Sequence, residues 1–571
     1  MPAVSVNELT RETWQIEIID ELPVITDDET VINGQAFDFR DGFSEVDFNN
    51  QQVGTTTTVG VNDFQLEAFD RPELELINID GAEYGISVNA NNVIVDGLRV
   101  EGFGVQRDTA NIIVHNSDDF VLRNSHLVDA GRSNLIVRAD SDRAIIENNF
   151  IETADKFGIE LDGELGAVLD AQVRENFIIN NATDSLIGDG IDAKQGTTAV
   201  IEHNLFTGNQ GSAVDSFQNP GGLSIRGNTI DGNGTGGVET SGIRLFGDQN
   251  QVVENVITNN SGAGVFLVAE GTRNTGGTDF NEISQNEFGG NGGIAIDLGE
   301  SAETLSEVQV GDGVSDFSTP NPLAANQGIQ TPTLLASTFD PDTGATSIEG
   351  VAGPNERIEI YRAVADANGA DNDQGEGVEY LGWVLSNASG EFQFQTNSLG
   401  PNDSISAIAI DANSNTSEFS MNLEVNVIPD ASSFGIDLSV EDVHQFAIAD
   451  FQFTDFENDN FQGVTFVSVP TEGMLLLDGM AVVAGQQVSA FDIDNGLLTY
   501  VPPNVTTASP LDSFEFNVSD GIDNSNNHSI TISLTNDAPV ISTDPTVTID
   551  ENEDLIQIQA SDPNGQTLLY S

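Results

Sequence analysis

The chain has 571 residues, which is too long for one ordinary hydrophobic core and predicts three or more domains. Its 92 acidic and 17 basic residues give a formal net charge of −75. This charge excludes nucleic acid and anionic membrane surfaces as partners, because both are bound by cationic surfaces. The sequence has no cysteine and no apolar stretch of membrane-spanning length, which excludes disulfides and thiolate chemistry and predicts no membrane insertion.

Short apolar runs separated by turn residues recur throughout, and long helical patterns are missing, so the chain is predicted to be all-β. Residues 1–79 include an alternating segment at 14–19 and are expected to form an N-terminal cap and the first coils of the structure that follows. The first residues lack the basic and apolar regions of a signal peptide. We therefore expect a cytoplasmic protein, export by a non-Sec route, or a fragment of a longer chain. The sequence ends inside an apparent strand, which favours the fragment.

A repeated unit of the form apolar-x-x-Asn-x-apolar-apolar runs through residues 80–300. Coils of this kind stack at the ~4.8 Å strand spacing, so that like residues form ladders. Asparagine suits the bend between strands, because it tolerates left-handed backbone geometry and its amide can bond its neighbour in the stack. The key asparagines, spaced by 24 to 31 residues, are Asn124, Asn148, Asn176, Asn204, Asn228, Asn255 and Asn286. These residues resemble the right-handed parallel β-helix repeats of the pectin-lyase-like superfamily, here of the bacterial secreted or surface type.

Further modules are expected after the repeat. Residues 301–328 are predicted to be a linker, and residues 329–427 look like an Ig-like β-sandwich. Residues 436–537 resemble a bacterial cadherin-like repeat, on stretches such as Gly473-Met-Leu-Leu-Leu-Asp-Gly479 and Thr535-Asn-Asp-Ala-Pro539. A second, truncated cadherin-like repeat is expected to start at 540–571. Such modules usually serve as a stalk or adhesive region at a bacterial surface.

Alignment of the coils predicts which side chains point outward from one sheet of the β-helix. The strand period of two sends apolar residues inward and the alternate residues outward. One outward column is Ser87, Ile113, Ile136, Glu160, Asp192, Asp215, Arg244 and Phe266. The other is Asn89, His115, Arg138, Asp162, Lys194, Phe217, Phe246 and Val268.

These columns contain the candidate site residues. Carboxylates stacked one strand spacing apart repel one another unless a cation or a basic side chain compensates them. Carboxylates, bases and aromatic rings on one sheet are what a polysaccharide site needs. The candidate catalytic residues are Lys194, Arg138 and His115; the substrate-binding residues are Arg244, Phe217 and Phe246; the metal ligands are Glu160, Asp162, Asp192 and Asp215. The alternative is that these polar residues are merely solvated and that loops cover the phenylalanines.

Residues Gly190-Ile-Asp-Ala-Lys194 are similar to the lysine-bearing segment of some calcium-dependent polyuronate lyases of the β-helix class. The resemblance implies that Lys194 is the base that removes the C5 proton of a uronic acid. It also implies that Asp162, Asp192 or Asp215 holds the metal.

Calcium is also expected in the C-terminal part of the chain. Residues 363–571 contain 33 carboxylates and no lysine or arginine, so this part would repel itself without cations. An acidic surface suited to a saline medium is the other explanation. The cadherin-like resemblance implies Ca²⁺ ligands at Glu441, Asp455, Glu457, Asp459, Asp520 and Asp537.

Two functions follow from these patterns. In the first, the chain is part of a large secreted or cell-surface bacterial protein, whose β-helix and calcium-stiffened modules mediate adhesion by binding a glycan. In the second, the β-helix is a polysaccharide lyase or C5-epimerase that acts on an acidic polysaccharide of the alginate or pectate type. The expected partners are a polysaccharide or cell-surface glycan and other copies of cadherin-like modules, and the expected location is extracellular or at the cell surface.

Overall fold

The computed structural model contains two compact units, residues 1–337 with 347–424 and residues 338–346 with 425–571. The residues that it describes are 13–35, 49, 51–106, 108–183, 188–271, 277–300, 313, 321–365, 373–439, 442–503, 510–535, 538–542, 558–562 and 567–569. None of the helices in these residues is long and apolar enough to cross a membrane.

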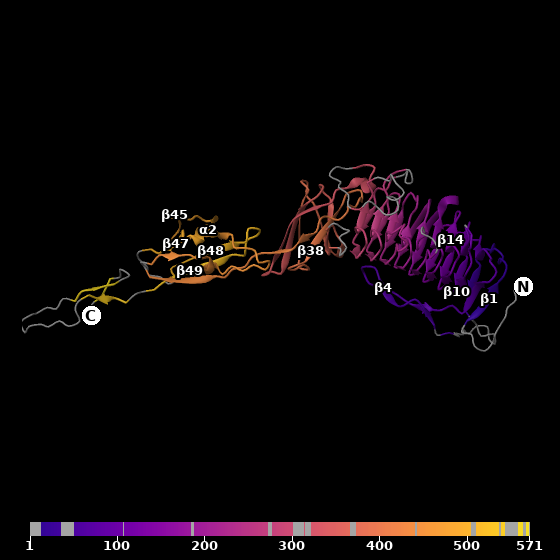
Figure 1. Ribbon diagram of the computed structural model, residues 1–571, viewed down its shortest axis with the longest axis horizontal. Coiled ribbons are helices and arrows are strands. Elements are labelled where there is room, and N and C mark those ends of the chain that lie inside the picture. Colours follow the sequence, from indigo (N-terminus) through magenta and orange to yellow (C-terminus); the bar gives the residue numbers. More distant parts are fainter. Residues whose placement is uncertain are drawn as a thin grey trace, which may run out of the picture. The chain divides into compact units, whose positions relative to one another are not determined.

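Three parallel sheets form the β-helix of the first unit, and each coil adds one short strand to each sheet (Figure 1). Sheet A contains β1 (Trp14–Ile18), β7 (Leu74–Asn78), β10 (Leu98–Glu101), β13 (His126–Val128), β16 (Phe150–Glu152), β19 (Phe177–Ile179), β22 (Leu205–Thr207), β25 (Thr229–Asp231), β28 (Val256–Thr258) and β31 (Glu287–Gly289). Sheet B contains β8 (Tyr84–Val88), β11 (Ala110–His115), β14 (Ser133–Arg138), β17 (Phe157–Asp162), β20 (Ile191–Ala193), β23 (Val214–Asp215), β26 (Ile243–Leu245), β29 (Val265–Leu267) and β32 (Ile296–Leu298). Sheet C contains β2 (Val31–Asn33), β9 (Ile94–Asp96), β12 (Val121–Arg123), β15 (Ile145–Glu147), β18 (Val168–Arg174), β21 (Thr197–Glu202), β24 (Leu223–Arg226), β27 (Gln251–Val253) and β30 (Glu282–Ser284). The predicted all-β fold with a parallel β-helix is confirmed.

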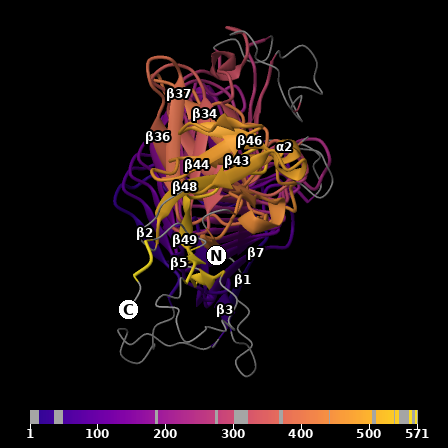
Figure 2. The ribbon, with the colours of Figure 1, turned by 90° about the vertical axis from the view of Figure 1, so that its left-hand side faces the viewer.

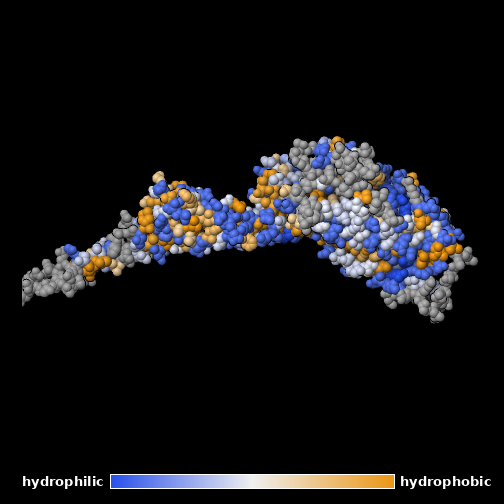
Figure 3. Space-filling view, viewed as in Figure 1, coloured by the Kyte–Doolittle hydropathy of each residue, from blue (hydrophilic) through white to orange (hydrophobic). Residues whose placement is uncertain are grey.

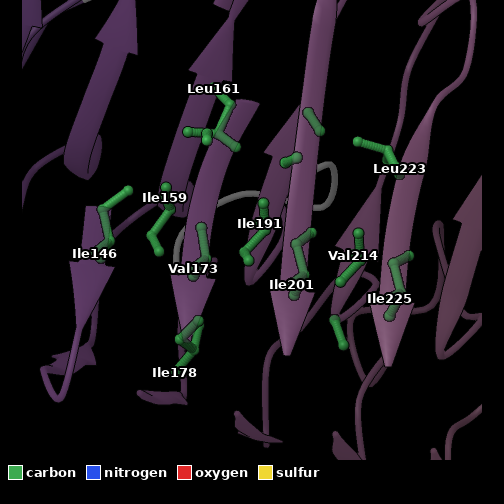
Figure 4. Packing of buried hydrophobic residues seen from close by; sticks show 14 of the residues in the cluster. Ile146, Ile159, Leu161, Val173, Ile178, Ile191, Ile201, Val214, Leu223 and Ile225 are labelled. Carbon is green, nitrogen blue, oxygen red and sulfur yellow. The ribbon is translucent and has the colours of Figure 1, made fainter. Parts of the chain in front are cut away.

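Apolar side chains from all three sheets fill the interior of the coils. Figure 4 shows Ile146 of β15, Ile159 of β17 and Ile178 of β19 pointing into the same space, and all three are fully buried. Burial of an isoleucine side chain contributes roughly 1.5–3 kcal/mol to folding. The outer surface of the coils in Figure 3 is mainly hydrophilic, as expected when alternate residues face solvent.

A ladder of buried asparagines follows the turn between sheets C and A. Each side-chain Nδ2 donates to Oδ1 of the asparagine one coil further on, at 2.9–3.0 Å. The ladder residues are Asn149, Asn176, Asn204, Asn228, Asn255 and Asn286. The predicted members Asn124 and Asn148 lie one residue before the buried ladder, whose position Ser125 and Asn149 occupy in these coils. Asn148 still bonds its neighbour in the stack as predicted, because its Nδ2 donates to Asn124 Oδ1 at 2.6 Å.

The left-handed backbone lies one residue before the ladder. Its φ angles are positive at Asn124, Asn148, Glu175, His203, Gly227, Glu254 and Gln285. The buried asparagines themselves have ordinary backbone angles. The predicted repeat unit therefore combined two neighbouring positions: one bends the chain, and the next carries the ladder.

Replacement of one ladder residue is expected to destabilise the fold. Asn228→Ala removes the acceptor of the Asn204 backbone N–H and the donor to the Ile201 and Arg226 carbonyls. Buried groups left unpaired cost about 1–3 kcal/mol each. Thermal unfolding measures the loss, with Ser224→Ala, at a half-buried position of β24, as the control. An unchanged midpoint for Asn228→Ala would contradict a stabilising ladder.

Residues 51–70 form an arm along the outer face of sheet A (Figure 1). It pairs β3 (Gln52–Val53) with β6 (Phe69–Asp70) and β4 (Thr57–Val59) with β5 (Phe64–Leu66). Val59 and Leu66 are buried against Phe177, and the Phe64 ring stacks on His203 with centroids 4.1 Å apart. Gly60 N donates to Thr229 Oγ1 at 3.0 Å. The described part of residues 1–79 therefore supplies β1, β2 and β7 to the coils and also covers an apolar strip of sheet A.

Residues 321–427 contain η2 (Ala325–Gly328), β33 (Thr333–Asp340), β34 (Ala345–Val351), β35 (Arg357–Ala363), β36 (Gly377–Leu385), β37 (Glu391–Thr396), β38 (Ser404–Ile410), β39 (Leu423–Glu424) and β40 (Asn426–Val427). The strands form two four-stranded sheets, in the orders β37-β34-β33-β40 and β36-β35-β38-β39. Figure 2 shows β34, β36 and β37. The Ig-like identity of this module and its predicted boundaries, including the linker 301–328, stay predictions.

This module covers the last coil of the β-helix. Tyr361 and Phe419 belong to the same buried cluster as the coil interior. Glu376 Oε1 accepts hydrogen bonds from Asn291 N at 2.8 Å and Asn291 Nδ2 at 3.1 Å. Glu359 accepts hydrogen bonds from Ser284 Oγ at 2.6 Å and Gln285 N at 3.0 Å. Buried carboxylates of the module thus satisfy donors at the open end of the stack.

The second unit has its own core, which includes Phe446, Phe451, Tyr500 and Phe516. Its elements are β41 (Phe434–Leu438), β42 (His444–Gln445), η3 (Ile448–Phe451), β43 (Gly463–Phe466), β44 (Met474–Leu477), β45 (Met480–Ala481), β46 (Gln486–Ser489), α2 (Ala490–Asp494), β47 (Leu498–Val501), β48 (Asp512–Ser519), β49 (His528–Leu534), β50 (Val540–Ile541) and β51 (Ala560–Ser561). The sheet orders are β41-β49-β48-β43-β46 and β42-β47-β44-β45. The cadherin-like identity of residues 436–537 and of the segment from 540 stays a prediction.

Candidate active site on the outer face of sheet B

The outer face of sheet B carries charged side chains from consecutive coils. The register pairs Glu160 with Asp192, Asp192 with Asp215, and Asp215 with Arg244, as the alignment of the coils predicted. Neighbouring strands lie about 4.8 Å apart, so these groups interact strongly. All four side chains are buried, with exposed fractions of 1 to 3%. Charges buried in this way require specific partners.

Glu160 is surrounded by cations. Lys194 forms an ion pair with Oε1, and Arg132 Nη2 lies 3.7 Å from the same oxygen. Ser133 Oγ donates to Oε2 at 2.9 Å. Burial alone would raise the pKa of Glu160, but Lys194 and the other donors lower it below its usual value. Glu160 is therefore an ionised carboxylate.

Lys194, the predicted base, is held by two carboxylates. Besides its ion pair with Glu160, its Nζ lies 3.5 Å from Asp192 Oδ2. Burial alone would lower the pKa of Lys194, but the charges of Asp192 and Glu160 raise it above its usual value. The ammonium must lose both ion pairs and a firmly held proton before it can act as a base.

Arg244 organises the next part of the site. Its Nη2 donates to Asp215 Oδ2 at 2.6 Å and to Glu239 Oε1 at 2.8 Å, and its Nε donates to Asp215 Oδ1 at 3.1 Å. Arg244 is 2% exposed, so it cannot bind substrate as predicted without first leaving these partners. Its role here is to neutralise two buried carboxylates.

The carboxyl groups of Asp189 and Asp192 lie in the same region, and the nearby basic side chains do not offset the effect of burial on their pKa. Burial and the charges of Glu239 and Asp215 raise the pKa of Asp189 well above its usual range. Burial raises the pKa of Asp192 well above its usual range too, against the opposing charge of Lys194. Both carboxyl groups therefore favour the protonated form.

Asp192 has an unusual environment for a buried group. Its Oδ1 is buried and has no hydrogen-bond partner among the described residues, while Oδ2 faces Lys194. A buried oxygen without a partner is costly and marks a place where a proton or a ligand group fits. Asp192 thus combines a high pKa with an oxygen free to donate or accept.

The other predicted residues on this face have separate surroundings. Arg138 Nη1 lies 3.5 Å from Asp108 Oδ1. His115 is half-buried, and burial together with Arg138 lowers its pKa. Phe246 is fully buried in a cluster with Phe266 and packs against Phe217, so its ring offers no open face for a sugar.

The same carboxylates include the candidate ligands of a cation. Oxygens of Asp189, Asp215 and Glu239 lie within 4.8 Å of one another, the only such group among the described residues. Oxygen ligands suit Ca²⁺, but Arg244 already donates to two of the three groups. The guanidinium takes the place of a metal, and the fit for Ca²⁺ is poor.

The predicted metal ligands of the β-helix also have other partners. Asp162 Oδ1 accepts a hydrogen bond from Glu164 N at 3.0 Å and caps η1 (Gly163–Leu165). Glu160 pairs with Lys194, and Asp215 pairs with Arg244. Of the predicted set, only Asp215 belongs to the group of three close carboxylates.

Sequence reasoning missed three residues of this site: Asp189 and Glu239, which lie outside the aligned strands, and Arg132, which lies between the strands of sheets A and B. Lys156 also lies between these strands. It and Lys194 are the only two lysines of the chain, which favoured a functional cluster on this face, and both contact the Phe157 ring there.

In the second unit, four of the predicted Ca²⁺ ligands are described and Glu441 and Asp537 lie outside the described residues. Asp459 N donates to Asp455 Oδ1 at 2.7 Å, and Val427 N donates to Glu457 Oε1 at 3.0 Å. Burial raises the pKa of Glu457. Within the described residues, these carboxylates do not form a group of three with oxygens within 4.8 Å.

Comparison with known proteins identifies the fold. Residues 171–310 match the family model described as a right handed beta helix region. The A-module of mannuronan C-5 epimerase AlgE4 from Azotobacter vinelandii is 17% identical, with 39% of this chain and 72% of that chain covered and a TM-score of 0.28. DFA-IIIase from Arthrobacter chlorophenolicus A6 is 12% identical, with 50% and 77% covered and a TM-score of 0.31.

Pectate lyase Pel9A is 12% identical, with 53% of this chain and 87% of that chain covered and a TM-score of 0.27. No curated protein matches the sequence. At these identities and TM-scores, the similarity carries no activity over to this chain. The family model and the three parallel sheets agree on one statement: the chain contains a right-handed parallel β-helix.

Proposed function

We propose that the β-helix binds a polysaccharide along sheet B and cleaves it by acid–base chemistry centred on Asp192. The observation that carries this proposal is the register neighbour pair Asp192 and Asp215. Asp192 favours the protonated form, while Asp215 is a carboxylate paired with Arg244. A carboxyl group that can give a proton, placed beside a carboxyl group held in an ion pair, is an arrangement suited to glycoside cleavage.

In the proposed reaction, Asp192 gives its proton to the leaving glycosidic oxygen. The charge of Asp215 stabilises the positive charge that develops on the sugar ring. The oxygen of a water molecule then bonds to the anomeric carbon, and the proton that this water loses returns to Asp192. Asp192 is buried among the described residues, so the side chains that cover it must move when substrate binds. A linear polymer laid along the stack would meet one coil after another, which suits an extended substrate.

The test is an incubation of the protein with a panel of neutral and acidic polysaccharides. New reducing ends without absorbance of unsaturated sugars support hydrolysis. If new reducing ends appear together with that absorbance, the reaction is an elimination and not a hydrolysis, and Lys194 is the candidate base. No cleavage of any polymer would leave a binding role in adhesion as the function of the β-helix.

A second candidate function concerns residues 436–537, which we propose bind Ca²⁺ and display the β-helix at the cell surface or outside the cell. One observation favours this proposal. Asp455 Oδ2 and Asp520 Oδ2 are both buried without a hydrogen-bond partner among the described residues. Free carboxylate oxygens are the ligands that Ca²⁺ prefers. Copies of the same module and surface glycans are the proposed partners.

Ca²⁺ is expected to raise the melting temperature of the second unit. A ligand at 100 times its Kd stabilises a protein by about 2.7 kcal/mol. The double variant Asp455→Asn, Asp520→Asn should lose this response, while Asp478→Asn, in an exposed turn, should keep it. Calorimetry with Ca²⁺ and with a chelator measures both. Identical melting in the two solutions would reject the Ca²⁺ proposal.

A further inference from the structure

Three cationic side chains gather around the ring of Phe157. Lys156 Nζ lies 4.3 Å from the ring centroid, Lys194 Nζ 5.1 Å and Arg132 Cζ 5.7 Å. Phe157 itself is buried, and the three cations are half-buried. They come from three consecutive coils, because Lys156 N donates to Arg132 O and Lys194 follows β20.

A cluster of three cationic side chains is unexpected in such an acidic chain. Only 17 of 571 residues are lysine or arginine, and both lysines of the chain are in this cluster. Cations that only serve to solubilise a surface are spread over it, whereas these converge on one ring. Their mutual repulsion opposes folding unless something negative compensates it.

The carboxylates that the structure describes around this ring do not complete this compensation. Glu160 has Lys194 and Arg132 as neighbours, and Asp192 faces Lys194. Lys156 has no ion pair or hydrogen bond from its side chain in the described structure, and Arg132 Nε is buried without a hydrogen-bond partner there. Phe157 supplies a favourable cation–π contact but no negative charge. Among the described residues, two donors are therefore left without an acceptor.

The position of Lys156 weakens its hold on the proton. Burial, and repulsion by Arg132 and Lys194, lower the pKa of Lys156. An anion placed between Lys156 and Arg132 would reverse this effect and satisfy both groups. Guanidinium and ammonium groups bind carboxylate and sulfate oxygens through charge-assisted hydrogen bonds.

We propose that Lys156 and Arg132 form a subsite for an anionic group of the polysaccharide, either the carboxylate of a uronic acid or a sulfate ester. The subsite lies beside Asp192, because Lys194 contacts both Asp192 and the shared Phe157 ring. It would place a charged sugar next to the bond that is cleaved. This assignment rests on the proposed function and narrows its substrate to acidic polysaccharides.

Binding measurements test the subsite separately from cleavage. Wild type, Lys156→Met and Arg132→Gln are titrated with polygalacturonate, alginate, dextran sulfate and neutral dextran. Each charge-assisted contact is expected to contribute a factor of about 10 to 100 in Kd, so each variant should lose that much affinity for one class of polyanion and none for dextran. The preferred polymer distinguishes carboxylate from sulfate.

Arg143→Gln is the matched control, because this exposed arginine before β15 pairs with Asp118 and Asp119, away from the subsite, and its replacement should leave binding unchanged. Thermal melting gives a second readout. Lys156→Met should melt at the same or a higher temperature than the wild type without polymer, because it removes a half-buried charge that Arg132 and Lys194 repel. A lower melting temperature would assign Lys156 a structural partner and overturn the subsite.

The outcomes for the subsite and for cleavage are distinguishable. If a polyanion binds tightly through Lys156 but is not cleaved, the proposed subsite is supported and the proposed cleavage is rejected. If the protein cleaves neutral polymers and binds dextran and polygalacturonate with equal affinity, the proposed acid–base chemistry is supported and the proposed subsite is overturned. Unchanged polyanion affinity in both variants overturns it as well.

Discussion

Asp192→Asn is expected to reduce the rate of polysaccharide cleavage by about 100- to 10,000-fold, because a positioned general acid contributes a factor of that size. The amide keeps the shape of the side chain but cannot give a proton to the leaving oxygen. Wild-type activity should fall as the pH rises through the raised pKa of Asp192. The residual activity of the variant should not show this decrease. Initial rates across the pH range measure both effects.

The control is Asp170→Asn, an exposed aspartate of β18 on sheet C. It should cleave like the wild type. Retention of full activity by Asp192→Asn would remove the general acid from the proposal. A parallel loss in both variants would indicate a change of fold rather than of chemistry.

The same substitution has an expected effect on stability with a defined sign. The folded-state pKa of Asp192 is raised by burial despite Lys194, so its contribution is favourable at low pH and is lost as the pH rises through that value. The amide of the variant would resemble the neutral acid at every pH. Asp192→Asn should therefore melt above the wild type at alkaline pH and close to it near pH ~4, the range of an unperturbed aspartate.

Arg244→Met is expected to cost about 3–5 kcal/mol of folding free energy, because it leaves buried carboxylates without their charge partner. The guanidinium neutralises Asp215 and Glu239, and both are almost completely buried. Without it, burial and mutual repulsion act on these groups and on Asp189, whose pKa is already raised. Denaturant unfolding at neutral pH measures the loss.

Two further measurements identify the cause. Acidic pH should restore much of the stability of Arg244→Met, because protonation removes the uncompensated charges. The triple variant with Asp215→Asn and Glu239→Gln should recover stability at neutral pH as well. Arg226→Met, which breaks an exposed pair with Glu202, is the control and should cost less than about 1 kcal/mol. Equal losses for Arg226→Met and Arg244→Met would reject this account.

Much of sheet B could be predicted from the sequence, because strand alternation is a strict geometric rule. The inward apolar positions fixed the register, and the register placed Glu160, Asp192 and Asp215 in one column. The partners of these residues could not be predicted in the same way. Glu239 and Asp189 come from turns, whose paths depend on tertiary packing, and local periodicity contains no information about them.

Burial was the second limit of prediction from the sequence. Phe246 alternates outward from its strand, which predicts exposure, yet it packs with Phe266 and is fully buried. The arm of residues 51–70 is a similar case, because its contact with His203 and Thr229 joins segments far apart in the chain. Alternation gives the direction of a side chain but not what another segment places over it.

The carboxylates of Glu359 and Glu376 have a consequence for the length of the β-helix. An asparagine side chain both accepts and donates, so each rung of a ladder offers a donor to the next, and nothing in the rung itself limits the number of rungs. A second ladder of buried asparagines runs from Asn181 through Asn209, Asn233 and Asn260 to Asn291. A carboxylate only accepts, so Glu376 ends this second ladder at Asn291. The stopping signal thus lies outside the repeat. Coils could be added or removed in its interior without altering either end, and a chain that lost this terminator would present an open template to which the coil of another molecule could add.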